Sequence, residues 1–175
     1  MNNTLKIESP RIERKNEAIE YINEFIEYKS HPNGTGGLHR LLDNYESWLN
    51  KLNNIDITNE KIPSNTYFAI RIIDNKIIGM INIRHRLNEY LTKIGGHIGF
   101  SVRPTERKKG YATEILFLGL KQCKKLNMEK ILVICDKSNI ASAKTIVKNN
   151  GVLENEIFDK GLSEDIIQRY WIDNK

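Results

Sequence analysis

The chain has 175 residues, of which 39% are hydrophobic and 28% are charged. This length and composition are typical of one globular domain with its own apolar core, and they argue against a disordered chain or a small disulfide scaffold. The 27 Lys and Arg residues and 22 Asp and Glu residues give a net charge of +5, which suits an anionic ligand and is weak evidence for binding nucleic acid.

The sequence lacks the signals of membrane insertion and secretion. No apolar stretch approaches the roughly 20 residues of a membrane span, and the first ten residues lack the apolar segment of a signal peptide. We therefore expect a cytoplasmic protein. Cys123 and Cys135 lie inside apolar runs without metal or redox spacing, so both are expected to be reduced core residues, and no metal site is expected.

The first third of the chain has the apolar spacing of amphipathic helices. One helix is expected near residues 18–26 and another over residues 38–52. The first apolar face consists of Ala18, Ile22, Phe25 and Ile26, and the second consists of Leu38, Leu41, Leu42, Tyr45, Trp48, Leu49 and Leu52. The glycine-rich residues 30–37 between them are expected to form a loop.

From residue 66 the pattern changes to that of strands. Residues 66–73 and 76–84 are expected to form two antiparallel strands joined by a tight turn at Asp74 and Asn75. Residues 84–91 form a polar connection. A third strand is expected over residues 94–102, because Pro104 stops it.

The second half alternates helices and strands. A helix is expected from about Gly110, because the apolar residues as far as Cys123 recur at helical spacing. The apolar run 130–136 is typical of a strand buried on both faces. Together with the strand 94–102, these elements predict a βαβ unit with parallel strands and a right-handed crossover.

The last elements are a short helix and a hairpin. The helix is expected over residues 139–148, with Asn150 or Gly151 in a left-handed cap. Residues 152–158 and 166–172 predict a closing hairpin. The whole chain, residues 1–175, therefore reads as one mixed α/β domain.

The residues before the helix at Gly110 indicate an anion site. In the sequence RKKGYA, Arg107, Lys108 and Lys109 precede a helix start, where backbone N–H groups lack partners and the helix dipole is positive. Gly110 lets a ligand approach the backbone closely, and Ala112 keeps the first turn free of bulk. A pyrophosphate suits this site; the alternative is a solvated basic loop. No Gly-x-x-x-x-Gly-Lys-Ser/Thr or Gly-x-Gly-x-x-Gly motif occurs here.

RKKGYA resembles the Gln/Arg-x-x-Gly-x-Gly/Ala motif of the GNAT superfamily of acyl-coenzyme A dependent N-acyltransferases. Arg107, Gly110 and Ala112 stand at its defining positions, and the element order from about residue 66 to 172 agrees as well. The chain looks most like a bacterial group of predicted acetyltransferases. The resemblance implies an α/β fold with a splayed mixed sheet flanked by helices, and acetyl-coenzyme A as the co-substrate.

The resemblance also implies where the cofactor binds. Backbone groups of Phe100 and Val102 would meet the acetyl and pantetheine groups, and residues 108–113 would surround the pyrophosphate. Asn139 would touch the pantetheine, although it is equally suited to be a helix N-cap. The implied cofactor-binding residues are Phe100, Ser101, Val102, Arg107, Lys108, Lys109, Gly110, Tyr111, Ala112, Thr113, Asn139 and Ser142.

The implied catalytic residues are His97 and Asn139. His97 stands where many bacterial relatives have a Glu facing the acceptor, so it is a candidate general base; the alternative is a histidine hydrogen-bonded within the sheet. Many relatives use a tyrosine as the general acid, and this chain has Ile146 at that position. A thiol with a pKa near 8.5 can leave as the thiolate without that acid.

The acceptor site is less defined, and Arg84, Glu89 and Tyr90 in the connection after the second strand are its candidate residues. The expected activity is acetyl transfer from acetyl-coenzyme A to a primary amine of a small molecule or peptide, by direct attack in a ternary complex. The alternative is a non-catalytic module that binds or senses acyl-coenzyme A. No nucleic-acid or membrane partner is expected, and a homodimer is compatible with the resemblance.

Overall fold

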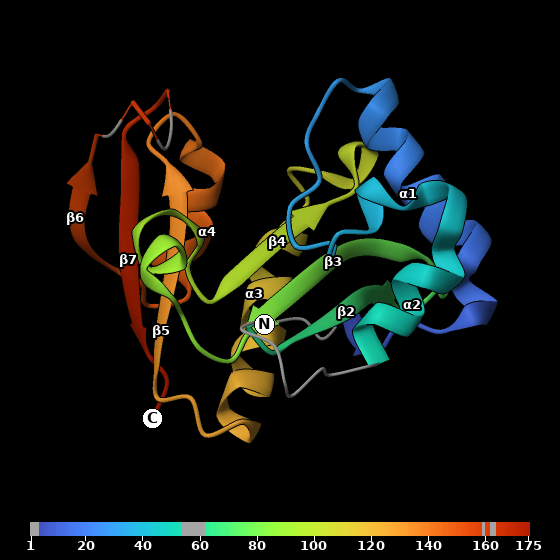
Figure 1. Cartoon of the computed structure of the whole chain (residues 1–175), viewed down its shortest axis with the longest axis horizontal. Coiled ribbons are helices and arrows are strands. Elements are labelled where there is room, and N and C mark those ends of the chain that lie inside the picture. Colours follow the sequence, from blue (N-terminus) through green and yellow to red (C-terminus); the bar gives the residue numbers. More distant parts are fainter. Residues whose placement is uncertain (1–3, 54–61, 159, 162–163) are drawn as a thin grey trace.

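The computed structural model describes residues 4–53, 62–158, 160–161 and 164–175. They form two antiparallel sheets with helices packed against them (Figure 1). The strands are β1 Leu5–Glu8, β2 Ser64–Arg71, β3 Ile77–Arg84, β4 Ile98–Val102, β5 Lys130–Asp136, β6 Val152–Ile157 and β7 Ile167–Asp173. The helices are α1 Lys15–Glu27, α2 Tyr45–Asn53, α3 Tyr111–Lys125 and α4 Ile140–Lys148. No helix in these ranges is long and apolar enough to cross a membrane.

The first sheet has the strand order β1-β2-β3-β4, and each neighbouring pair is antiparallel. The predicted hairpin of β2 and β3 is confirmed, with Asn75 at a φ of 57° in the turn between them. Asn tolerates this left-handed conformation better than most residues. The sequence pattern does not predict β1, because its four residues are too few to show an alternation.

Helices α1 and α2 cover one face of this sheet and bury an aromatic cluster against it. The cluster consists of Tyr21, Phe25, Tyr45, Trp48 and Phe68, each less than 2% exposed. Neighbouring rings contact one another with centroids 5.1 to 6.2 Å apart. The contacts fix both helices on the sheet, and with them the loop that connects the two helices.

The predicted apolar face of α1 is mostly confirmed. Ala18, Ile22 and Phe25 are buried, but Ile26 is 63% exposed, so its assignment to the core is wrong. Each residue turns a helix by about 100°, which carries Ile26 away from the face that holds Phe25. The second predicted helix begins later than expected, because residues 38–44 form two short 3-10 turns before α2.

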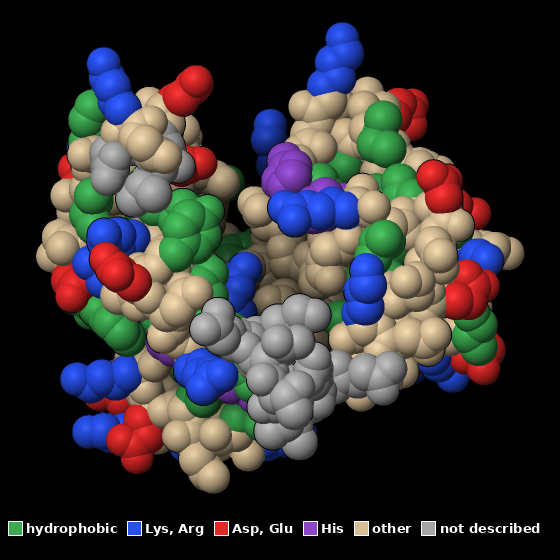
Figure 2. Space-filling view, in the orientation of Figure 1, with side chains coloured by type: hydrophobic (Ala, Val, Ile, Leu, Met, Phe, Trp, Pro, Cys, Tyr) green, Lys and Arg blue, Asp and Glu red, His purple; other side chains and the backbone are tan. Residues whose placement is uncertain are grey.

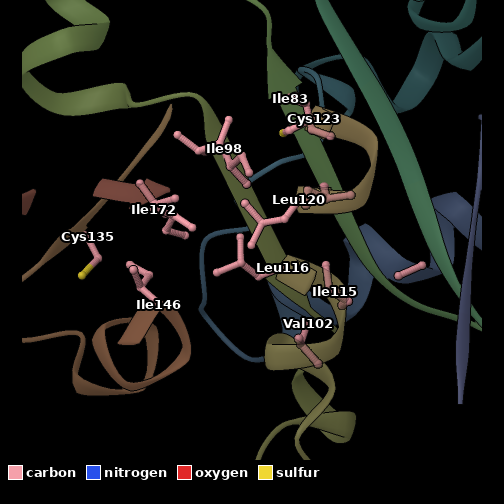
Figure 3. Close-up of a cluster of buried hydrophobic side chains, with 14 of the residues drawn as sticks. Ile83, Ile98, Val102, Ile115, Leu116, Leu120, Cys123, Cys135, Ile146 and Ile172 are labelled. Atoms are coloured by element: carbon pink, nitrogen blue, oxygen red, sulfur yellow. The ribbon is translucent and has the colours of Figure 1, made fainter. Parts of the chain in front are cut away.

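Helix α3, which the sequence predicts well, packs on the other face of the first sheet and joins the two sheets. Gly119 allows the close approach, because a Cβ there would lie 2.3 Å from Cδ1 of Ile81 on β3. Figure 3 shows Leu116 and Leu120 of α3 between the side chains of β4 and those of β7 and α4. Cys123 and Cys135 are free and buried in this core, as predicted. One apolar core therefore holds both sheets.

The second sheet has the strand order β5-β7-β6 and is also antiparallel. The predicted closing hairpin of β6 and β7 is confirmed; its predicted loop includes residues outside the described ranges. The α/β fold class is confirmed, but the expected parallel pairing of β4 with β5 is not formed, since the two strands belong to different sheets. The third predicted strand is also shorter, because residues 91–95 form a π-helical turn and β4 begins only at Ile98.

Helix α4 ends in a left-handed residue, as predicted, and this residue is Asn150 with a φ of 64°. We expect Asn150→Ala to lower the free energy of unfolding by about 1 kcal/mol, because alanine is strained in this region of φ. Asn150→Gly is the matched control and should leave the stability unchanged or slightly higher. Urea denaturation of the three proteins measures the difference, and equal stability of the alanine and glycine variants would contradict the cap.

Candidate active site

Strands β4 and β5 meet at one point and diverge from it. The backbone N–H of His97 donates to the carbonyl of Leu132 over 2.7 Å, and the N–H of Leu132 donates to Nδ1 of the His97 imidazole over 2.9 Å. Beyond this pair no ladder joins the two strands in the described chain, and Figure 1 shows them spreading apart. We call this opening the split, and His97 with Leu132 its vertex.

The edge of β4 in the split carries backbone groups without a strand partner. In an antiparallel ladder, alternate residues direct their N–H and C=O groups toward the partner strand, and the others direct them away. The hydrogen bond from Arg84 N to His97 O sets this alternation for β3 and β4. Phe100 and Val102 therefore direct their backbone groups into the split, as the predicted cofactor contacts require.

The opposite edge, on β5, has the same property. The hydrogen bond from Lys137 N to Ile166 O shows which residues of β5 face β7. Leu132 and Ile134 belong to the other set, so their backbone groups face the split. Leu132 is occupied at the vertex, which leaves Ile134 opposite the free edge of β4. An extended amide-containing chain between these edges finds hydrogen-bond partners on both sides.

The start of α3 lies at the far end of β4 and leaves backbone donors free. Lys108 and Gly110 have φ values of 63° and 87°, and this double left-handed geometry turns the chain into the helix. Within the described chain, none of the N–H groups of residues 108–112 donates a hydrogen bond. A pocket of about 340 Å³ opens beside them. It is lined by Thr4, Lys109, Gly110, Tyr111, Thr113, Glu114 and Lys148. These free donors and the helix dipole suit an anionic ligand.

The three adjacent cations have different surroundings. Arg107 donates to the Ser30 hydroxyl over 2.7 Å and lies 5.3 Å from the centre of the Phe25 ring, so its side chain holds the end of α1. Lys109 donates to the Glu106 carboxylate over 2.8 Å. Lys108 has no such partner among the described residues. A direct contact of Arg107 or Lys109 with a cofactor phosphate therefore remains a prediction, and each would compete with an existing partner.

Glu106, which the sequence reasoning passed over, links this loop to the first sheet. It is 7% exposed and accepts hydrogen bonds from Lys109 and, over 2.9 Å, from Arg71 on β2. Arg71 also binds Asp74 through two hydrogen bonds and the Tyr111 hydroxyl through one. The signal was present in the sequence, because Glu106 is the only acid directly before the three cations. The network fixes the loop that precedes α3.

The pKa of Glu106 is lowered in the folded protein, because burial, which raises it, is outweighed by hydrogen bonds from Lys109 and Arg71. A lowered pKa stabilises the fold above the unfolded pKa near 4.3, and this contribution is lost as the pH falls through the folded pKa. We expect Glu106→Gln to cost about 1 kcal/mol at pH 7 and little below pH 4. Unfolding measured from pH 7 to pH 3 tests this.

The control for this prediction is Glu89→Gln, which removes an exposed ion pair with Lys93. Such surface pairs contribute little, so the pH dependence of its stability should match that of the natural chain. A Glu106→Gln variant whose stability runs parallel to that of the Glu89→Gln variant across this pH range would contradict the role of the network.

The side chains of the other predicted cofactor residues have mixed surroundings. The Ser101 hydroxyl is buried away from the split, where it hydrogen-bonds the Tyr21 hydroxyl over 2.8 Å and the Asn33 carbonyl. The Asn139 Oδ1 accepts from the Ser142 N–H over 3.1 Å, which is the N-cap of α4 that the sequence left open. Contact of these residues with a cofactor remains a prediction.

The predicted catalytic and acceptor residues are not gathered in one place. His97 is buried at the vertex, and burial followed by the charge of Arg84 lowers its pKa. Arg84 donates to the carbonyls of Gly95 and Gly96, so it holds the π-helical turn. Glu89 pairs with Lys93 on the surface and Tyr90 is 57% exposed. Their role in binding an acceptor remains a prediction.

The loop of residues 30–37 contributes more to the site than the sequence indicates. Gly34 packs on β4 so closely that a Cβ there would lie 2.2 Å from the Gly99 carbonyl oxygen. Figure 2 shows a hollow between the two sheets, with His and Lys or Arg side chains together at its edge. The glycines of this loop were a signal for a close approach of the backbone. The described residues contain no group of three or more His, Cys, Asp or Glu that is placed to hold a metal ion.

Comparisons with known proteins place the chain in a family. A search of the curated proteins finds no match. Among solved structures, the ribosomal-protein-S5-alanine acetyltransferase from Vibrio fischeri is 15% identical, with a TM-score of 0.70 over 98% of this chain and 94% of that one. The spermidine/spermine N-acetyltransferase SpeG from Vibrio cholerae is 14% identical, with a TM-score of 0.68 over 99% and 95%.

A third similar structure is the microcin C7 self immunity acetyltransferase MccE in complex with acetyl-CoA and AMP. It is 17% identical, with a TM-score of 0.67 over 98% of this chain and 93% of that one. At these identities the likeness shows the fold. The family model of the acetyltransferase (GNAT) domain matches residues 15–151, well over half of the chain. The chain therefore belongs to the GNAT acetyltransferase family.

Proposed function

We propose that this protein transfers an acetyl group from acetyl-coenzyme A to a primary amine. The observation that supports this most is the split, where the backbone groups of Phe100 and Ile134 face each other without a strand partner. The pantetheine arm carries amides at the spacing of a short peptide and would lie between these edges. The pyrophosphate would take the free N–H groups of residues 108–112 at the start of α3.

The chemistry needs no group beyond the two substrates. The amine lone pair attacks the thioester carbonyl carbon, the carbon–sulfur bond breaks, and the sulfur leaves with the bonding electrons. The proton lost by the nitrogen ends on that thiolate, either directly or through water, because a thiol with a pKa near 8.5 holds it at neutral pH. Ile146 is fully buried and supplies no acid. The protein contributes positioning and backbone donors at the carbonyl.

The edge of the hollow bears on the acceptor. The rings of His31 and His39 contact each other with centroids 5.1 Å apart, and Thr35 hydrogen-bonds Nδ1 of His39 over 2.8 Å. Burial lowers the pKa of His39, and the charges of His31 and Arg40 lower it further, so cationic groups are crowded here. We therefore propose an acceptor amine that also carries an anionic group. A polycation such as spermidine would be repelled.

The test is a thiol-release assay with acetyl-coenzyme A and a panel of primary amines: an amino acid, a peptide and spermidine. We expect release with an anionic amine and little with spermidine. Calorimetry with coenzyme A, run in parallel, separates the readings. Binding without thiol release across the panel would favour the sensing module. No binding at all would overturn the proposed function.

A further inference from the structure

We propose that His97 is a positioning residue, whose imidazole ends the pairing of β4 with β5 and so fixes where the split begins. The inference deepens the proposed function and rests on it, because the split matters for function only if the cofactor lies there. It assigns to His97 a different role from the general base that the sequence resemblance implies. The argument starts from the two backbone groups of Leu132.

Both backbone groups of Leu132 that face the split bind His97. Its carbonyl accepts from the His97 backbone N–H, as in a regular parallel ladder. In such a ladder its N–H would donate to the carbonyl two residues earlier on the neighbouring strand, which is that of Gly95. It donates instead to Nδ1 of the His97 side chain. The imidazole therefore takes the place of a backbone acceptor, and the ladder stops.

The carbonyls that the imidazole displaces have another partner. Nη1 of Arg84 receives the carbonyl oxygens of Gly95 and Gly96 over 3.0 and 2.9 Å. Gly96 has a φ of 62°, and a Cβ there would lie 2.7 Å from the Leu132 carbonyl oxygen. Only glycine fits this turn. Arg84, Gly96 and His97 together satisfy every backbone group that the interrupted ladder leaves at the vertex.

The same contact defines the protonation state of the ring. Nδ1 accepts a hydrogen bond, so its lone pair is occupied and the neutral ring carries its proton on Nε2. Burial and the nearby Arg84 favour this neutral form. A ring in this tautomer has no lone pair left to take a proton from an amine. The nearest aromatic neighbour, Trp171, lies 6.3 Å away between ring centroids and carries no charge.

The test compares three substitutions at the vertex. His97→Asn places its Oδ1 near the position of Nδ1, so it can still accept from Leu132, whereas His97→Gln resembles the ring at Nε2 and His97→Ala removes the acceptor. We expect the Asn variant to bind coenzyme A within about threefold of the natural chain and to keep its pH profile of turnover. The Ala and Gln variants should lose about tenfold or more in affinity, because a buried N–H is left without a partner.

Two outcomes would overturn the inference. One is an Asn variant that binds coenzyme A normally but loses turnover as fully as the Ala variant, together with the acid limb of its pH profile; that result assigns His97 as the base. The other needs no cofactor: nitrogen NMR of the free protein should show Nδ1 unprotonated and Nε2 protonated from pH 6 to 8, and the opposite tautomer would contradict the contact. If the natural chain fails to bind coenzyme A, the proposed function falls, and the NMR result still decides the role of His97 at the vertex.

Discussion

Replacing Gly110 by alanine should weaken the binding of coenzyme A by at least tenfold. Gly110 precedes α3 at a φ of 87°, where an alanine is strained by about 1 kcal/mol or more. The loop can relieve that strain only by turning the N–H groups of residues 108–112 away from their present direction. Each hydrogen bond from such a donor to a charged phosphate contributes roughly 1.5 to 3 kcal/mol, so the loss of one already exceeds a tenfold change.

The chain offers a closely matched control in Gly37. It has a φ of 88°, and at both positions a Cβ would meet no atom of the described chain within 4 Å. Gly37→Ala therefore introduces the same backbone strain without touching the start of α3. Both variants should lose about 1 kcal/mol of stability, and only Gly110→Ala should lose affinity in calorimetry with coenzyme A. Equal affinities of the two variants would place the pyrophosphate elsewhere.

The elements that the sequence predicts correctly depend on local patterns. The hairpin of β2 and β3, the closing hairpin and α3 each show their period within the segment itself. The separation into two sheets does not. It depends on His97 meeting Leu132 far along the chain, and a strand pattern at residues 94–102 cannot show which acceptor a neighbouring strand will use. A parallel pair was therefore expected where the structure has a split.

The candidate site shows the same division. The motif locates the free N–H groups of residues 108–112, because a helix start follows from the local sequence. It does not reveal that Arg107 and Lys109 already have partners, since Ser30 lies on a distant segment and Glu106 acts through a network with Arg71. Long side chains reach partners that the spacing of residues does not predict. Backbone sites are thus easier to predict from sequence than side-chain sites.

Replacing Gly34 by alanine should lower the free energy of unfolding by about 3 kcal/mol, a larger loss than any single side-chain contact in the loop would explain. The new Cβ would lie 2.2 Å from the Gly99 carbonyl oxygen and 2.7 Å from the Cα of Phe100, at a φ of +72°. Both atoms belong to the backbone of β4, so no flexible side chain can move to make room. The loop must lift from the strand, or the strand must shift into the split.

The two responses have different consequences for activity. If the loop lifts, the contact of Asn33 with Ser101 breaks, turnover falls, and coenzyme A still binds, because the free edge of β4 stays in place. If β4 shifts, affinity and turnover fall together. We expect the first, since the antiparallel pairing of β4 with β3 holds the strand more firmly than the loop is held. Urea denaturation, calorimetry and thiol release, each measured beside the Gly37→Ala variant, separate these cases. A Gly34→Ala variant as stable as Gly37→Ala would show that the loop does not rest on β4, and the acceptor side of the hollow would then have to be built from other residues.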